Sequence, residues 1–257
     1  MTQREKLLIL TPVKNAAGSL DRYFALLSRL AYPRRLTSLG FLESDSSDGT
    51  HALLARHVSL LRRRYRRVGL WKRDFGFHIP AGLPRWAPAF QLPRRTVLAK
   101  SRNHLLFHAL DDEDWVLWLD VDVIDYPPDV VGRLLATGKD IVHPHCVLDY
   151  GGATHDLNAW RDGGRTRMAD LRQAGETVAR LDAVGGTMLL VRADIHRDGL
   201  IFPPFLYGKG SPAVRRPHPL GPNLVGELET EGLGIMAQDM GHQCWGLPGL
   251  EILHAKE

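Results

Sequence analysis

The sequence of 257 residues contains only two cysteines, Cys146 and Cys244. Two cysteines are too few for a disulfide framework, and nothing in the sequence requires them to pair. The sequence also lacks an apolar run of the ~18 residues that a membrane-spanning helix needs. Residues 1–6 are polar and the apolar run at 7–10 is short, so no secretory signal is expected. We therefore expect a cytoplasmic protein.

A large charge of one sign is missing as well. The formal net charge is +4, and 24% of the residues are charged and 44% hydrophobic, which is ordinary for one globular core. This basic excess suits an anionic ligand such as a nucleotide, but it is too diffuse to indicate binding of nucleic acid. Arginine is concentrated in residues 62–67. Such a run is typical of a solvated helix end, and peripheral contact with a membrane surface is the alternative.

Segments typical of strands and of helices alternate along the sequence. Short apolar runs suited to buried strands occupy residues 6–11, 36–42, 68–71, 115–119, 140–144 and 183–191. Helical signals occupy residues 20–30, 50–67, 96–110 and 129–136. This alternation predicts an α/β fold with a Rossmann-like, mostly parallel sheet and helices on both faces. We expect a single domain, residues 1–257, with a nucleotide-binding half at 1–125 and an acceptor-binding half at 126–257.

The clearest chemical signal directly follows the apolar run at residues 115–119. Asp120 and Asp122 flank a single valine, so an extended chain places both carboxylates on the same side. Two carboxylates this close repel each other, and a divalent cation removes that conflict. Oxygen ligands suit Mg²⁺ or Mn²⁺, which also bind substrate phosphates. At the carboxyl end of a buried strand the pair predicts a metal–diphosphate site, although chance copies of this pattern lie mostly in solvated loops.

Polar loops after the first two predicted strands form a second candidate region. The first strand ends in the loop of residues 12–15, and the second is followed by the loop 43–50, which is rich in Asp and Ser. A predicted helix begins directly after this loop. Hydroxyls, carboxylates and a helix amino end can hold a base, a ribose or a phosphate. A plain turn with a helix cap is the alternative, since Ser and Asp often form such turns.

Five further residues, in three segments, carry candidate chemistry. Arg102 is poorly placed for the apolar face of its predicted helix, which makes it a candidate phosphate or ribose contact, with a surface salt bridge as the alternative. Gly185 and Gly186 permit close approach of a backbone or a sugar. Glu229 and Glu231 begin a predicted helix, where acidic residues are also favoured by the helix dipole alone.

Four stretches, in the same order, resemble the fungal Anp1/Mnn9/Van1 mannosyltransferase family. They are residues 8–16 (LILTPVKNA), 41–48 (FLESDSSD), 99–123 with the motifs AKSRN and WLDVDV, and 184–186 (VGG) together with 229–232 (ETEG). Together they span nearly the whole chain, which makes the combination more specific than any one motif. The resemblance implies a GT-A glycosyltransferase fold. It also implies transfer of mannose from GDP-mannose with Mn²⁺ and with retention of configuration.

The resemblance further implies roles for individual residues. Asp120, Asp122 and His254 would bind the metal, and Asp122 would act in catalysis together with Glu229 and Glu231. Roles in binding the donor are implied for Thr11, Pro12, Lys14, Asp45, Ser46, Asp48, Arg102, Asp120, Gly185 and Gly186.

These expectations combine into a metal-dependent glycosyltransferase. A cation held by the two aspartates, aided by Lys14 or Arg102, would stabilise the leaving diphosphate. A glutamate would stabilise the charge on the sugar or orient the acceptor hydroxyl, which belongs to a glycan, a lipid or a small molecule. The first alternative is a catalytically silent subunit or glycan-binding module. The second is a metal-dependent nucleotidyltransferase, against which the absence of a Walker-type triphosphate loop argues.

Overall fold

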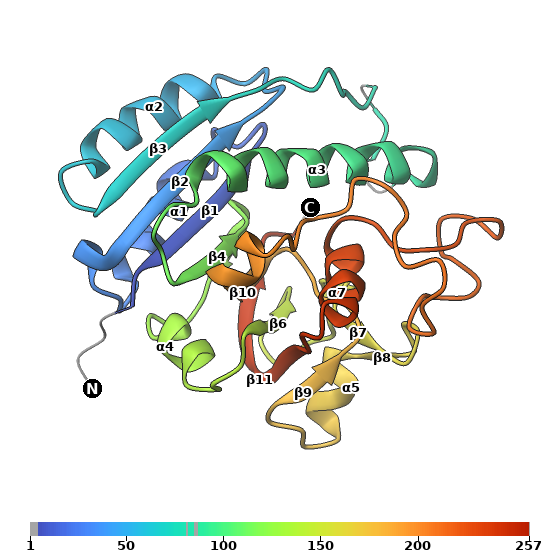
Figure 1. Ribbon diagram of the computed structural model, residues 1–257. Coiled ribbons are helices and arrows are strands. Elements are labelled where there is room, and N and C mark those ends of the chain that lie inside the picture. The colour runs from blue at the N-terminus through green and yellow to red at the C-terminus, as the bar shows by residue number, and fades with distance from the viewer. Residues whose placement is uncertain (1–4, 81, 85–86, 257) are drawn as a thin grey trace.

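The structure is a computed structural model that describes residues 5–80, 82–84 and 87–256. Its helices are α1 (Leu20–Arg29), α2 (Thr50–Leu61), α3 (Pro88–Ala109), α4 (Val130–Leu135), α5 (Met168–Gln173), α6 (Ala193–Arg197) and α7 (Glu229–Asp239), with a 3-10 helix at Arg34–Leu36. Its strands are β1 (Leu7–Val13), β2 (Thr37–Glu43), β3 (Arg67–Lys72), β4 (Trp115–Leu119), β5 (Val123–Asp125), β6 (Ile141–Val147), β7 (Trp160–Arg161), β8 (Thr166–Arg167), β9 (Ala179–Leu181), β10 (Met188–Arg192) and β11 (Cys244–His254). Figure 1 shows their arrangement.

A mixed nine-stranded sheet runs through the described part of the molecule. Its strand order is β3-β2-β1-β4-β10-β6-β11-β5, and β9 pairs with β11. Strands β3, β2, β1 and β4 are parallel to their neighbours. Strand β10 is antiparallel to β4 and to β6, and β11 is parallel to β6. Because β10 pairs with β4, the two predicted halves of the chain share one sheet.

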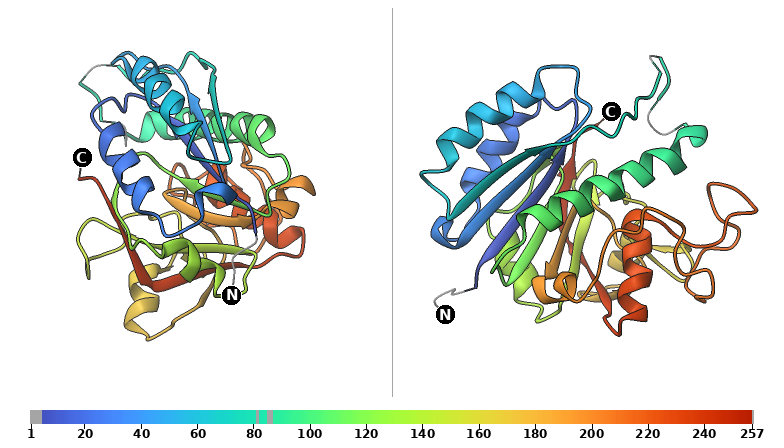
Figure 2. Two further views of the ribbon diagram at one scale, coloured as in Figure 1. Left: turned by 90° about the vertical axis from the view of Figure 1, so that its left-hand side faces the viewer. Right: turned by 45° about the horizontal axis from the view of Figure 1, so that its top comes forward.

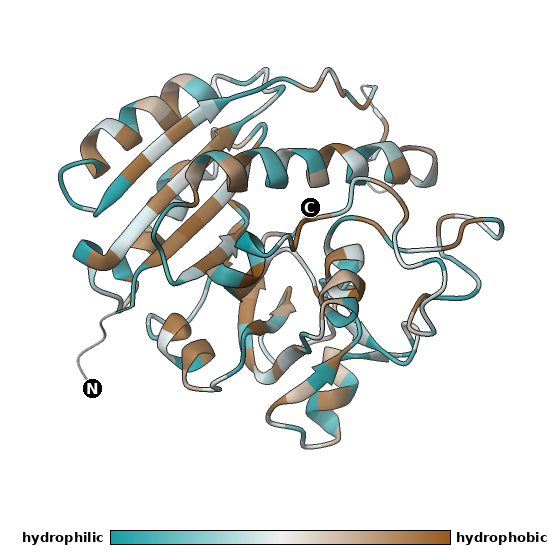
Figure 3. Cartoon of the chain, in the orientation of Figure 1, coloured by the Kyte–Doolittle hydropathy of each residue, from teal (hydrophilic) through white to brown (hydrophobic). Residues whose placement is uncertain are grey.

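Helices cover both faces of this sheet. Successive side chains along a strand point to opposite faces, so an apolar strand presents apolar side chains to both. Leu7 and Ile9 of β1 pack in one core with residues of α1, α2 and α4. Leu8 and Leu10 pack in a second core with residues of α3, α5, α6 and α7. Figure 2 shows α1 and α2 on one side of the sheet and α3 on the other, and Figure 3 shows hydrophobic residues along the strands. The predicted α/β fold with helices on both faces is confirmed.

The largest differences between predicted and observed element bounds concern α2, α3 and β10. Helix α2 ends at Leu61 instead of residue 67, because residues from Arg67 onward pair with β2 as strand β3. Helix α3 begins at Pro88 instead of residue 96, and proline suits the first turn of a helix. Strand β10 begins only at Met188, so Gly185 and Gly186 lie in the loop before it.

The arginine-rich segment is only partly the solvated helix end that was expected. Arg66 is 2.6 Å from Asp112 and 3.0 Å from Glu113, and Arg67 is 2.8 Å from Glu113. These two arginines therefore join the start of β3 to the turn before β4. Residues 62–64 are exposed, and a membrane contact through them stays a prediction.

A long connection leads from α6 to α7 and carries no helix or named strand. Its end is tied back by a bridge between Tyr207 and Glu227. This connection crosses in front of α7 and approaches the amino end of α3 (Figure 1). Among residues 5–80, 82–84 and 87–256, no helix combines the length and the apolar composition that a membrane crossing requires.

Candidate active site

A cleft of about 450 Å³ opens at the carboxyl end of β4. Its walls come from α3, the segments 155–158 and 219–220, and the first turn of α7. Among the described residues, the cleft brings together six of those that the sequence predicted for the site: Arg102, Asp120, Asp122, Gly186, Glu229 and His254. Residues far apart in the sequence therefore meet in one place.

Asp120 directly follows β4, and its backbone N–H donates to the Thr187 carbonyl at 2.9 Å. Burial raises the pKa of its carboxyl to about 6. The Arg102 guanidinium opposes this rise, whereas the carboxylates of Asp122 and Glu229 add to it. The positive charge of Arg102 alone therefore does not compensate the carboxylates of Asp120, Asp122 and Glu229. A divalent cation is the kind of group that such an excess favours.

His254 ends strand β11, which pairs with β5 and so lies beside the chain that follows β4. Its Nε2 is 3.1 Å from Asp122 Oδ1, and its Nδ1 is 2.7 Å from the Ala255 carbonyl oxygen. A hydrogen bond from Nδ1–H to that carbonyl directs Nε2 toward Asp122. Burial by itself would lower the pKa of His254, but the contact with Asp122 outweighs it and the pKa is raised.

The pair of Asp122 and His254 offers one oxygen and one nitrogen ligand, with Asp120 next to it. Carboxylate oxygens suit Mn²⁺ or Mg²⁺, and imidazole is a common metal ligand, so these side chains fit such an ion. Within the described part of the chain, no three His, Cys, Asp or Glu side chains form a complete metal cage. Phosphate oxygens of a bound nucleotide would complete the coordination, as is usual for Mg²⁺.

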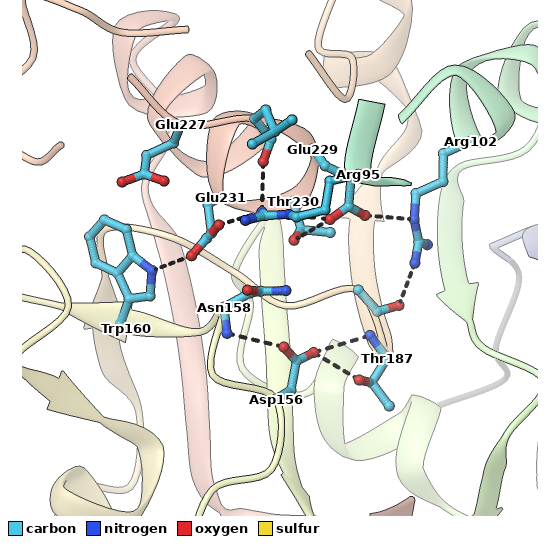
Figure 4. A network of polar contacts seen from close by, with 12 residues as sticks. Arg95, Arg102, Asp156, Asn158, Trp160, Thr187, Glu227, Glu229, Thr230 and Glu231 are labelled. Carbon is cyan, nitrogen blue, oxygen red and sulfur yellow. Dashed lines mark hydrogen bonds and ion pairs between the residues drawn. The ribbon is translucent and has the colours of Figure 1, made fainter. Parts of the chain in front are cut away.

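The Arg102 guanidinium connects Asp120 to the first turn of α7, and Figure 4 shows its contact with Glu229. Its Nη2 is 3.0 Å from Asp120 Oδ1, and its Nε is 3.1 Å from Glu229 Oε1. Its carbon Cζ lies 5.6 Å from the ring of Trp118 and 5.3 Å from that of Phe202. The alternative of a surface salt bridge is wrong, because Arg102 is buried. Its Nη1 has no hydrogen-bond partner among the described residues, which leaves an unsatisfied donor in the wall of the cleft.

The two glutamates at the start of α7 differ in their surroundings. Glu229 lines the cleft, and its φ of 56° is a left-handed conformation that residues with a side chain rarely adopt. Glu231 is 0% exposed, and its carboxylate binds Arg95, Arg215 and the indole N–H of Trp160. Both oxygens of Glu231 are thus engaged inside the protein (Figure 4). Its environment favours a structural role over the catalytic one that was expected.

Gly185 and Gly186 make room for protein side chains. A Cβ at Gly185 would lie 1.9 Å from Asp156 Oδ2, and one at Gly186 would lie 2.5 Å from Arg102 Nη2. We expected a backbone or a sugar to approach these glycines closely, but the side chains of Asp156 and Arg102 occupy that space. The Asp156 carboxylate is also held by the hydroxyl of Thr187 at 2.8 Å and by its N–H at 3.3 Å.

Sequence reasoning missed several residues of the cleft. Asp156 and Asn158 lie in a polar, glycine-rich stretch in which no pattern distinguishes them. Burial opposes ionisation of Asp156, but the nearby His143 and the Thr187 hydrogen bond hold its pKa well below the usual range. Arg95 lies one residue before the helix predicted at 96–110, whereas in the structure it belongs to α3 and lines the cleft. The helix-start signal at the prolines before it was the one clue available.

The loops after β1 and β2 hold each other in place through carboxylates. Asp45 accepts the backbone N–H groups of Phe75 and Gly76 at 3.0 and 2.9 Å. Asp48 accepts the N–H of Ala17 at 3.0 Å. These bonds lower the pKa of both aspartates even though burial acts in the opposite direction. These bonds are structural, as in the alternative of a plain turn with a helix cap, but they join neighbouring loops instead of closing one turn.

Other residues predicted for the nucleotide pocket have similar partners. The Thr11 hydroxyl is fully buried, 2.7 Å from the Tyr23 hydroxyl, and thus belongs to the core. Lys14 donates to the Phe77 carbonyl at 2.6 Å, and Ser46 accepts a backbone N–H from the loop after β1 at 3.0 Å. None of the nucleotide-binding residues predicted between positions 11 and 48 lines the cleft. Nucleotide contact by this region stays a prediction.

Comparison with known proteins gives a family match. The family model described as Anp1 matches residues 1–167 and 162–206. Two curated relatives from Schizosaccharomyces pombe, the mannan polymerase II complex anp1 subunit and the mannan polymerase complex subunit mnn9, are each 29% identical over 99% of this chain. The chain spans 65% of the length of the first relative and 81% of the length of the second.

Solved structures share the arrangement of the sheet and helices. The mannosyltransferase PcManGT from Pyrobaculum calidifontis, in complex with GDP-Man and Mn2+, has a TM-score of 0.61 at 15% identity, covering 99% of this chain and 58% of that chain. GalNAc-T7 with UDP, GalNAc and Mn2+ has a TM-score of 0.62 at 12% identity, covering 100% of this chain and 45% of that chain. At such low identity the likeness concerns the fold alone, and it confirms the predicted GT-A fold.

Proposed function

The chain belongs to the Anp1 family, and from that premise we propose that it transfers mannose from GDP-mannose to a hydroxyl group of an acceptor. The proposed reaction depends on Mn²⁺ and retains the configuration of the sugar. Its acceptor is a glycan, a lipid or a small molecule. A structural neighbour described with GDP-Man and Mn2+ supports this choice of donor and metal.

The strongest support for the proposal is that an acidic pair, a histidine and an arginine lie together in one cleft. Asp122 lies 3.1 Å from His254, and Asp120 lies 3.0 Å from Arg102 in the same cleft. Carboxylate and imidazole ligands next to a buried guanidinium suit a metal-bound diphosphate. Glu229 joins this group through Arg102, on the side away from Asp120.

Each residue has a role in this reaction. The metal, held by Asp122 and His254, would supply stabilisation of the negative charge on the leaving diphosphate. Arg102 adds a fixed positive charge, because Asp120 and Glu229 raise its pKa although burial alone would lower it. The Glu229 carboxylate would stabilise positive charge at the anomeric carbon or accept the proton of the acceptor hydroxyl.

A catalytically silent subunit is the second candidate function. The curated relatives are themselves described as subunits of mannan polymerase complexes, which favours an assembly of this kind. The intact acidic pair beside His254 argues against loss of activity. A metal-dependent nucleotidyltransferase would instead consume a nucleoside triphosphate and a sugar phosphate. A cytoplasmic location stays a prediction.

The test is release of GDP from GDP-mannose, measured with and without Mn²⁺. We expect metal-dependent release by the wild type and a loss of at least ~100-fold for Asp122→Asn, equivalent to about 3 kcal/mol of barrier. Release of pyrophosphate from GTP and mannose 1-phosphate serves as the control for a nucleotidyltransferase. If neither substrate is consumed in Mn²⁺, the silent subunit is the better description.

A further inference from the structure

A row of charges of alternating sign crosses the cleft, beginning at the half-buried Asp120 and continuing through buried side chains. Asp120 lies 3.0 Å from Arg102, which lies 3.1 Å from Glu229. Glu229 in turn lies 3.8 Å from Arg95. Burial of an ionised group is costly unless an opposite charge accompanies it, and the members of this row provide that charge for one another.

The row continues behind the first turn of α7. Arg95 pairs with Glu231, whose Oε1 is 2.6 Å from Arg215 Nη2. Arg215 is also held by Glu227, with Nε 2.8 Å from Oε1. Beyond Arg215, the next charged side chain that lines the cleft is another cation, Arg167. The alternation of charge therefore ends at this point.

Arg167 has no carboxylate partner of its own in the part of the chain that the structure describes. Its Nη1 donates to the Leu157 carbonyl. The side chains of Arg167 and Arg215 both lie next to Gly164. A Cβ built on this glycine would be 3.6 Å from Arg167 Nη2 and 2.8 Å from Arg215 Cδ, so the two arginines are neighbours. Burial and the charge of Arg215 lower the pKa of Arg167, and the carboxylates of Glu231, Asp170 and Asp156 offset this lowering only in part. An anion from outside the protein would stabilise the charged form of this side chain.

We propose that Arg167, supported by Arg215, forms a subsite for an anionic group of the acceptor, a phosphate or a carboxylate. This inference rests on the proposed transferase function and adds the chemical class of the acceptor. A planar guanidinium binds such groups through two parallel hydrogen bonds. The subsite lies at the far end of the charge row from Asp120 and Asp122, so it is separate from the proposed position of the donor diphosphate. Leu157 also lines the cleft and offers an apolar contact for a sugar ring.

The test measures binding of three probes to the full chain by calorimetry, in saturating GDP and Mn²⁺. The probes are mannose 6-phosphate, mannuronate and methyl mannoside, which separate phosphate from carboxylate and both from a neutral sugar. We expect at least one charged probe to bind about 10-fold or more tightly than methyl mannoside. Equal binding of all three probes would overturn the proposal. Displacement of GDP by the charged probe would also overturn it, because the anion would then occupy the donor site.

Matched variants assign the effect to Arg167. Arg167→Gln is expected to lose the preference for the charged probe, and Arg167→Lys is expected to retain much of it. Arg165→Gln removes an exposed arginine from the turn directly before β8 and should leave the preference unchanged. A preference that survives in Arg167→Gln contradicts the assignment. None of these measurements needs sugar transfer, so anion binding in a chain that never releases GDP from GDP-mannose would count against the proposed function alone.

Discussion

The two glutamates of α7 show how the surroundings of a single residue decide its role. Glu229 and Glu231 have the same side chain and lie two positions apart on one helical turn. The left-handed backbone of Glu229 places its carboxylate in the cleft, whereas the carboxylate of Glu231 is enclosed by two arginines and an indole N–H. Strained backbone is retained in proteins mostly where the surrounding structure or the function requires it.

Replacement of Glu229 by glutamine therefore tests catalysis with little change of shape. We expect kcat for transfer from GDP-mannose to fall by about 100-fold or more, because the charge that acts on the sugar or the acceptor is lost. The melting temperature should change little. Steady-state kinetics and a thermal melt provide the two readouts. An unchanged kcat would show that Glu229 has no part in the chemistry.

His196 supports a second prediction, which concerns stability. It is buried and neutral, because Nδ1 lies 2.7 Å from the Leu200 carbonyl and Nε2 accepts the Trp118 indole N–H at 3.3 Å. Burial lowers its pKa from 6.5 to about 4. The unfolded chain therefore binds more protons between these pH values, and stability is lost as the pH falls through this range, by up to about 3 kcal/mol.

Urea unfolding between pH 7.5 and pH 4 measures this loss. His145 is also buried with a pKa lowered to about 4, so the slope of the wild type contains both contributions. The variant His196→Gln keeps His145 and should lose stability less steeply on acidification than the wild type. Parallel pH profiles for the two proteins would contradict the assignment to His196.

At the scale of elements, the contact between α3 and α7 shapes the cleft. Helix α3 turns polar residues inward as well as apolar ones, since Arg95, Arg102 and Asn103 are all buried. The side-chain amide of Asn103 donates from Nδ2 to the Phe202 carbonyl at 2.7 Å, and its Oδ1 accepts the Phe202 N–H at 2.9 Å. The apolar periodicity of the sequence therefore predicts the helix, but it does not predict which polar side chains the helix buries. Those side chains pair with charged and polar groups from distant segments.

Glu231 is expected to hold these two helices together. The change Glu231→Gln leaves the buried Arg95 with less compensating charge, so we expect a loss of about 2–4 kcal/mol in the free energy of unfolding. Addition of Arg95→Gln should cost less in this background than in the wild type, because the two residues are coupled. Glu176→Gln is the control, since its ion pair with Arg161 lies at the surface and should contribute less than ~1 kcal/mol. Additive effects of Arg95 and Glu231 would contradict the coupling.

At the scale of the whole molecule, the mixed sheet brings together the residues proposed to bind the metal. Strand β11 comes from the end of the chain, yet it pairs with β5 and ends at His254 beside Asp122. The proposed metal ligands therefore depend on the fold of the second half of the chain as well as the first. Binding of metal and nucleotide should in turn stabilise the complete fold, because only the folded chain presents the site.

Nucleotide and metal together are thus expected to raise the melting temperature. GDP at about 100 times its Kd, with Mn²⁺, should add roughly 2.7 kcal/mol, or roughly 5–10 °C for a chain of this size. UDP, ADP and dTDP serve as controls for the base, and a chelator should remove the shift. His254→Gln should reduce the part of the shift that depends on the metal. A larger shift with UDP than with GDP would contradict the proposed donor.

Much of the fold was predictable because its signals are local. The apolar runs of β1 and β4 and the helical periods between them depend only on neighbouring residues. Asp120 and Asp122 stood out for the same reason, since two acids at the end of an apolar strand are visible in a short window. Thr11 shows the limit of such patterns, because its position at a strand end gave no hint that its hydroxyl is buried in the core.

The sequence by itself thus determined the order of β1 to β4 with the helices between them, the acidic pair and the family resemblance. Only the tertiary structure decided that Glu229, and not Glu231, reaches the cleft, that His254 meets Asp122, and that Arg167 lies beside Arg215. The physical reason is the range of the interactions. Hydrophobic periodicity is set along the chain, whereas the partner of a buried charge is chosen by packing among segments that the sequence keeps far apart.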